Sequence, residues 1–197
     1  MEDLISRRII LHPITDADLT ILHEFRNRKS FIAFCTNRKK GISIQEFYEE
    51  ISNDFRRDRH FQCLIIRKQD SVPIGTIFSY CYNKDDRYTF VTTFIDDTFQ
   101  RAGYGAEAVP LFLSFLFRTY KLYKIYMDVY EYNNVSLSTM QSSQIFCEEG
   151  RFKKQKCVGR KRYDVIRFAC YRKNLQKISD FLIRIKQVKT KNPNERR

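Results

Sequence analysis

The chain has 197 residues, 43% of them apolar and with 17 Phe and 12 Tyr, which is enough for one domain with one sizeable core. No apolar run reaches the roughly 18 residues of a transmembrane helix, and the N-terminus lacks the order of a signal peptide, so we expect a cytoplasmic protein. The formal net charge of +13 indicates anionic partners, although a need for solubility explains it equally well.

The cysteines and histidines do not have the spacing of a metal site. The six cysteines contain no CxxC pair, and the three histidines lie apart from them in the sequence. We therefore expect no metal and six reduced thiols. Cys63, Cys81 and Cys170 lie in apolar, strand-like runs, which predicts that their side chains are buried.

A strand and two amphipathic helices are predicted at the N-terminus. Residues 7–11 have the pattern of a short strand. Thr15 and Asp18 form a capping box before a first helix, and Ser43 and Glu46 repeat that signal before a second one. The apolar positions at helical spacing are Leu19, Leu22 and Phe25 in the first helix and Ile44, Phe47, Tyr48, Ile51 and Phe55 in the second.

The apolar period becomes strand-like at Phe61. Three β-rich runs (61–68, 73–81 and 88–96), separated by turn-like segments, predict an antiparallel meander. We then expect a helix at 106–120, a strand at 123–132, a short helix that begins at Asn133 or Asn134, and a closing hairpin of 149–158 with 162–173.

A strand, a helix and a strand across 88–130 imply one parallel pairing. The fold class is thus α/β, with a mixed, mostly antiparallel central sheet flanked by helices. We divide the chain into a domain at 1–173 and, at 174–197, an amphipathic helix with a basic tail whose last eight residues are expected to be disordered.

Gly103 and Gly105 lie between a predicted strand and a predicted helix. Free backbone N–H groups at a helix start, beside residues without side chains, suit phosphate oxygens. A P-loop would need Lys and Ser or Thr where Ala106 and Glu107 stand, and four strands precede this segment, which disfavours a dinucleotide fingerprint. An ordinary turn would need only one glycine.

The stretch from Gln100 to Ala106 resembles the Q/R-x-x-G-x-G/A motif of the GNAT superfamily of acyl-CoA N-acyltransferases. Segments from Arg7 to Lys173 follow the order of the branch that includes ribosomal-protein N-terminal, spermidine and nucleotide-amino-sugar acetyltransferases. This resemblance implies a GNAT fold and acetyl-CoA as co-substrate. The residues that it assigns to coenzyme A are the backbone near Phe94 and Ile95, the loop Gln100, Arg101, Ala102, Gly103, Tyr104, Gly105 and Ala106, and Asn133.

Two positions depart from the catalytic pattern of the family that the chain resembles. Many relatives have a tyrosine acid seven residues after the asparagine, where this chain has Met140, and a glutamate base where it has Phe90. The resemblance places Ser136 near the thiol, and Glu131 ends the preceding strand, so these two are the candidate catalytic residues. Other candidates for moving a proton are Tyr130, Tyr132 and Ser138.

Three functions follow from these observations. The first is acetyl transfer from acetyl-CoA to a primary amine; the second is a catalytically impaired GNAT fold that binds coenzyme A or an RNA or ribosome surface. The third is a nucleic-acid-binding module, indicated by basic and aromatic runs such as residues 151–163. For the enzyme, the excess of Lys and Arg favours a protein terminus or a phosphate-bearing amino sugar over a polyamine. A homodimer is also considered.

Overall fold

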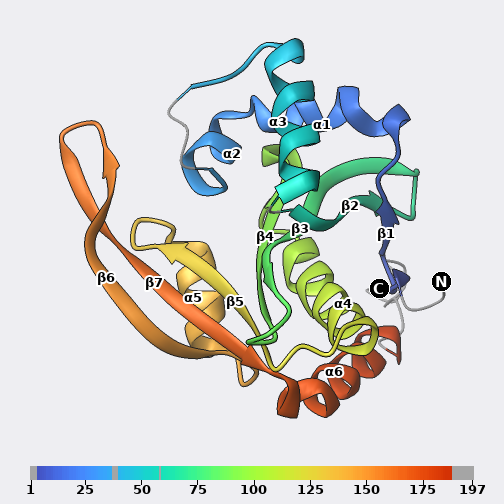
Figure 1. Ribbon diagram of the computed structural model, residues 1–197. Coiled ribbons are helices and arrows are strands. Elements are labelled where there is room, and N and C mark those ends of the chain that lie inside the picture. The colour runs from blue at the N-terminus through green and yellow to red at the C-terminus, as the bar shows by residue number, and fades with distance from the viewer. Residues whose placement is uncertain (1–3, 37–39, 58, 188–197) are drawn as a thin grey trace, which may run out of the picture.

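Seven strands of the described residues form one sheet, in the order β1-β2-β3-β4-β5-β7-β6 (Figure 1). The computed structural model describes residues 4–36, 40–57 and 59–187; the predicted disordered tail lies outside these ranges. The strands are β1 (Ile9–Pro13), β2 (Arg59–Arg67), β3 (Val72–Asn83), β4 (Tyr88–Ile95), β5 (Lys124–Tyr130), β6 (Cys147–Val158) and β7 (Lys161–Tyr171).

The helices cover both faces of this sheet. They are α1 (Leu19–Arg26), α2 (Lys29–Phe34), α3 (Ile44–Arg57), α4 (Tyr104–Thr119), α5 (Asn134–Ser142) and α6 (Leu175–Gln187). Short 3₁₀ segments are found at η2 (Asp16–Asp18), η3 (Asp97–Phe99) and η4 (Arg172–Asn174). The predicted α/β class with a mixed, mostly antiparallel sheet is confirmed.

Two cores form because successive strand side chains point to opposite faces. On β2, Cys63 and Ile65 belong to the core under α4, α5 and α6, whereas Leu64 between them belongs to the core under α1, α2 and α3. On β4, Val91 and Phe94 divide in the same way. The larger core is centred on α4, whose residues from Ala108 to Leu113 are all buried.

The helix starts follow the predicted caps. Thr15 and Asp18 form a capping box at η2, which leads into α1. Ser43 and Glu46 exchange hydrogen bonds before α3, with Ser43 N donating to Glu46 Oε2 at 2.7 Å. Helix α2 was not predicted, since it has six residues and no capping side chain at Arg28.

The C-terminal helix α6 packs against α4, and Ile178 on its apolar stripe is fully buried. All six cysteines are free, and Cys63 and Cys170 are buried as predicted. The prediction for Cys81 is wrong, because its side chain is exposed. The chain has φ of 50° at Cys81, where the register between β3 and β4 shifts and the strand alternation is broken.

Strands β4 and β5 pair only at their beginnings. Their parallel register joins Tyr88, Thr89 and Phe90 to Lys124, Ile125 and Tyr126, although β4 continues to Ile95 and β5 to Tyr130. The two strands therefore separate towards their carboxyl ends, which opens the sheet beside the glycine loop.

Candidate active site

The loop between β4 and α4 is built around Gly103. Its φ of 80° and ψ of 10° place it in the left-handed region at the N-cap of α4, where glycine avoids steric cost. A Cβ at Gly105 would lie 3.7 Å from Ile95 Cγ1. Gln100 ties the loop to the end of β4, because its Nε2 donates to Ile95 O at 3.1 Å and to Asp97 Oδ1 at 2.7 Å.

The first turn of α4 is open to a ligand. Arg101, Ala102, Gly103 and Ala106 are exposed, and Tyr104 and Gly105 are half-buried. The first N–H groups of a helix lack partners within it, and the helix dipole adds partial positive charge there. The loop and this turn can therefore hold an anionic group such as a diphosphate.

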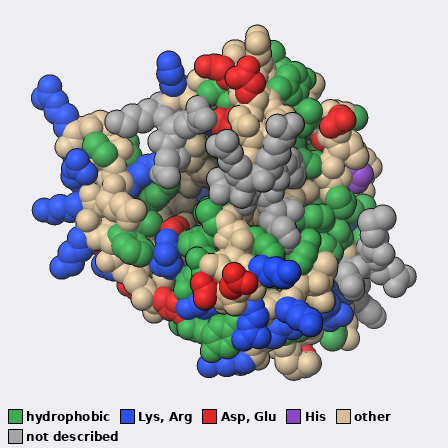
Figure 2. Space-filling view, viewed as in Figure 1, with side chains coloured by type: hydrophobic (Ala, Val, Ile, Leu, Met, Phe, Trp, Pro, Cys, Tyr) green, Lys and Arg blue, Asp and Glu red, His purple; other side chains and the backbone are tan. Residues whose placement is uncertain are grey.

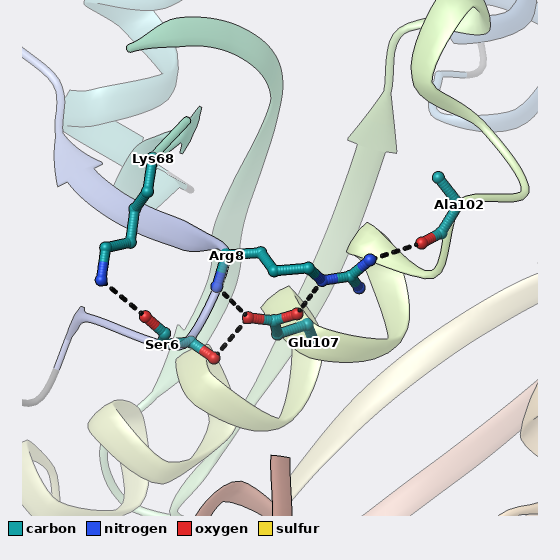
Figure 3. A network of polar contacts seen from close by, with 5 residues as sticks. All are labelled: Ser6, Arg8, Lys68, Ala102 and Glu107. Atoms are coloured by element: carbon teal, nitrogen blue, oxygen red, sulfur yellow. Dashed lines mark hydrogen bonds and ion pairs between the residues drawn. The ribbon is translucent and has the colours of Figure 1, made fainter. Parts of the chain in front are cut away.

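Arg8 on the N-terminal side of β1 holds this loop in place (Figure 3). Its Nη1 donates to Ala102 O at 2.9 Å, and its Nε donates to Glu107 Oε2 at 2.8 Å. Glu107 also accepts from Arg8 N at 2.8 Å and from Ser6 Oγ at 2.6 Å. Burial raises the pKa of the Glu107 carboxyl, but the hydrogen bonds from Ser6 and Arg8 outweigh it and hold that pKa below its usual range.

The opening between β4 and β5 exposes backbone groups of β4. Asp96 N donates to Ile74 O on β3 at 2.9 Å. In an antiparallel pair, the N–H and C=O groups of every second residue point to the partner strand. Those of Phe94 therefore point towards β3, and those of Ile95 point towards β5. The Phe94 ring is buried against Phe25 and Phe31, at centroid distances of 5.5 and 5.2 Å. Of the two predicted positions on β4, Ile95 thus has its backbone at the opening.

The end of β5 leads into α5 through Asn133, whose side chain caps the helix by accepting from Ser136 N at 3.3 Å. Ser136 is half-buried in the first turn. Glu131 is exposed, and its carboxylate accepts a hydrogen bond from Asp164 N on β7 at 3.1 Å. It does not line the cleft between the helices α1 to α3 and the β6–β7 hairpin. Met140 is only 7% exposed and belongs to the core under α4, α5 and α6.

A cleft of about 440 Å³ lies on the face of the sheet opposite α4, between the helices α1 to α3 and the β6–β7 hairpin. In Figure 2 a hollow lies between this hairpin, on the left, and the rest of the molecule. The cleft is lined by Leu22, Arg26, Phe31, Phe34, Cys35, Thr36, Phe47, Glu50, Ile51, Gln62, Thr76, Phe78, Tyr80, Cys81, Thr92, Asp128, Tyr130, Gln155, Lys156 and Val165.

The two carboxylates of the cleft are each paired with an arginine. Both oxygens of Asp128 accept from Arg167, Oδ1 from Nε and Oδ2 from Nη2, each at 2.8 Å. The Arg167 guanidinium lies 4.7 Å from the centroid of the Phe90 ring. Phe90 therefore supports this ion pair. Arg26 Nε lies 3.4 Å from Glu50 Oε1.

The phenols at the cleft keep their protons at neutral pH. Burial raises the pKa of Tyr80 to about 12, and it raises the pKa of Tyr130 as well. Burial likewise raises the pKa of the Cys35 thiol to about 12. Lys156 Nζ donates to Thr36 O at 2.9 Å and to the Tyr130 hydroxyl at 3.3 Å, which ties β6 to the end of α2.

Sequence reasoning missed the polar residues of the cleft. Arg26, Glu50, Asp128 and Lys156 lie on α1, α3, β5 and β6, and no spacing in the sequence relates them. They converge only because the helices α1 to α3 and the hairpin lie over the same face of the sheet. Among the described residues, no group of His, Cys, Asp and Glu side chains could hold a metal ion, and no helix is long and apolar enough to cross a bilayer.

An acyltransferase that uses acyl-CoA is the class that this fold and loop define, and comparison with known proteins gives the family. Residues 8–143 match the family model described as an acetyltransferase (GNAT) domain. The chain therefore belongs to the GNAT acetyltransferase family. It is an acetyl-CoA-dependent N-acetyltransferase, and the predicted family and co-substrate are confirmed.

Solved structures share the fold at low sequence identity. A Vibrio cholerae spermidine N-acetyltransferase in complex with CoA and spermine is 20% identical, with a TM-score of 0.76 over 86% of this chain and 98% of that one. The RimL ribosomal L7/L12 alpha-N-protein acetyltransferase in complex with coenzyme A is 14% identical, with a TM-score of 0.73 over 85% and 96%. A Bacillus anthracis acetyltransferase of the GNAT family is 17% identical, with a TM-score of 0.70 over 86% and 98%. No curated protein sequence matches the chain significantly.

Proposed function

We propose that the protein acetylates the primary amine of a protein terminus or of a small molecule such as a nucleotide-linked amino sugar, and not a polyamine. The observation that carries this proposal is the pairing of the cleft's carboxylates. Asp128 is bound by Arg167 and Glu50 by Arg26, and Lys156 adds a further positive charge. A polycation would need carboxylates that are not already neutralised, whereas a single amine would not.

Acetyl-CoA lies at the glycine loop, across the gap between β4 and β5 from the cleft. The backbone N–H groups from Gly103 to Ala106 bind the diphosphate, with Gln100 and Arg101 at the edge of the loop. The Ile95 backbone orients the pantetheine and acetyl parts in the gap between β4 and β5, and Asn133 contacts them from the start of α5. The acceptor amine enters from the cleft and meets the thioester where the strands separate.

The groups that could transfer a proton at the site favour positioning of the amine and the thioester as the main source of the rate enhancement. The attacking amine must be neutral, and the departing thiolate must gain a proton. Glu131 and Ser136 are our candidate groups for these transfers, with the exposed carboxylate acting through water. The protonated phenols of Tyr80 and Tyr130 supply hydrogen-bond donors at the cleft.

A catalytically impaired GNAT fold is the second candidate. Its support is that Met140 is a core residue and that Phe90 lies beneath the Arg167 guanidinium, so neither position offers an acid or a base. Exposed basic side chains at the β6–β7 hairpin, over which Figure 2 shows several Lys and Arg, would then meet RNA or a ribosome. They include Lys153, Lys154, Arg160, Lys161 and Arg162.

Acetyl-CoA consumption measured with three classes of amine tests the proposal. The classes are spermine, a peptide with a free N-terminus and an amino-sugar phosphate. We expect turnover with the peptide or the sugar and little with spermine. Preferred turnover of spermine would overturn the acceptor assignment, and acetyl-CoA binding without turnover of any amine would favour the impaired fold.

The cytoplasmic location, supported by the six free thiols, and the homodimer stay predictions.

A further inference from the structure

Arg26, the last residue of α1, lines the cleft, and only part of its guanidinium is hydrogen-bonded. Its side chain is 4% exposed. Nε lies within hydrogen-bonding distance of Glu50 Oε1, at 3.4 Å. Within the described part of the chain, Nη1 and Nη2 are buried and have no hydrogen-bond partner. A guanidinium has five N–H donors, of which these two nitrogens carry four.

Apolar side chains share the lining of the cleft with this guanidinium. Leu22, Phe31, Phe47, Ile51 and Phe78 line the same cleft, and the guanidinium carbon lies 5.7 Å from the centroid of the Phe31 ring. Burying charged donors without acceptors is costly, so a protein seldom keeps such a group unless something else binds it. Because the side chain is buried, its attraction for a negative group is also stronger than in water.

We propose that Arg26 determines acceptor specificity by binding an oxyanion of the substrate, a carboxylate or a phosphate on the molecule that carries the amine. The two Nη atoms of arginine form a planar fork that matches two oxygens of such a group. Glu50 engages only Nε, and the two buried Nη atoms at the cleft have no acceptor in the described part of the chain. The proposal rests on the proposed function, since it names a feature of the acceptor that the cleft receives.

Two matched pairs of amines test it by acetyl-CoA consumption. Glucosamine and glucosamine 6-phosphate differ by a phosphate; alanylalanine amide and alanylalanine differ by a carboxylate. For at least one pair, we expect the wild type to favour the oxyanion-bearing member by about tenfold or more in kcat/KM. The pair that shows the preference identifies the group.

Variants at Arg26 assign that preference to its guanidinium. Arg26→Met should bring the ratio close to one by raising KM for the oxyanion-bearing amine, with kcat and CoA affinity largely retained. Arg26→Lys should restore part of the ratio, because it keeps the charge without the fork. Arg118→Met is the matched control, since Arg118 is an exposed arginine on α4 and should leave the ratio unchanged.

Thermal shift with inorganic phosphate or acetate, in excess CoA and against equal chloride, gives a second readout that needs no turnover. The stabilisation should appear in the wild type and in Arg118→Met, and be lost in Arg26→Met. The proposal is overturned if Arg26→Met keeps the wild-type ratio or the wild-type shift, or if the wild type has neither. If no amine is acetylated but the shift depends on Arg26, the proposed function fails while the oxyanion site stands.

Discussion

Arg8 and Glu107, 99 residues apart in the sequence, join the start of the sheet to the first turn of α4 through a 2.8 Å contact between Nε and Oε2. The same arginine holds Ala102 O, so one side chain fixes both the loop and the helix behind it. A Cβ at Gly103 would lie 3.4 Å from Arg8 Nη2. Arg8 is therefore a positioning residue for the glycine loop.

The Glu107 carboxylate should make stability depend on pH. Glu107→Gln should lower the free energy of unfolding at pH 7 by about 1–3 kcal/mol, because buried donors lose a charged acceptor. Since the folded-state pKa lies below the ordinary 4.5, this contribution is present above pH 4.5 and is lost as the pH falls through the folded-state value.

Urea unfolding between pH 3 and 7 measures this effect, with Glu148→Gln as the control. Glu148 is 38% exposed and pairs with Arg151 at 3.5 Å, so its substitution should change little at any pH. A difference between Glu107→Gln and the wild type that persists unchanged at pH 3 would contradict the argument.

Substitutions at the loop glycines should remove CoA binding. Gly103→Val and Gly105→Val place a branched side chain where the diphosphate is proposed to lie, and we expect at least about a hundredfold weaker binding by calorimetry. Gly103→Val should also cost stability because of its φ of 80°.

Gly159→Val separates that strain from the binding effect. Gly159 has φ of 58° at the hairpin turn, and a Cβ there would meet no atom within 4 Å. This control should lose stability and keep its CoA affinity. Normal affinity in folded Gly103→Val and Gly105→Val proteins would mean that the loop is only a turn.

The sequence predicted the layers and the loop, because both depend on local signals. Capping boxes, the change of period at Phe61 and the two closely spaced glycines each act within a few residues. The acceptor cleft could not be predicted in that way, since Arg26 and Asp128 approach the same space only through sheet order and helix packing. Arg8 was missed for the same reason: nothing near it in the sequence indicates Glu107 as its partner.

Gly75 should tolerate no side chain. A Cβ at this position would clash with the carbonyl oxygen of Phe94 and lie 3.1 Å from Ile95 Cα, both on the neighbouring strand β4. Gly75→Ala should therefore lower the free energy of unfolding by about 3 kcal/mol or more, because backbone and not a flexible side chain must move. Gly150→Ala, whose Cβ would only touch the Phe152 ring at 3.9 Å, is the control for chemical denaturation.

Met140 provides the test of how the thiolate is protonated. Its side chain is 7% exposed within the core, so Met140→Leu should be nearly neutral in both stability and turnover. Met140→Tyr must fit a longer, polar side chain into that space, and we expect a loss of about 1–3 kcal/mol in stability with no gain in kcat. Unfolding curves and the pH profile of kcat check both variants. A higher kcat with a new pH dependence in Met140→Tyr would show instead that position 140 reaches the leaving sulfur, and that the wild type works without the acid its relatives use.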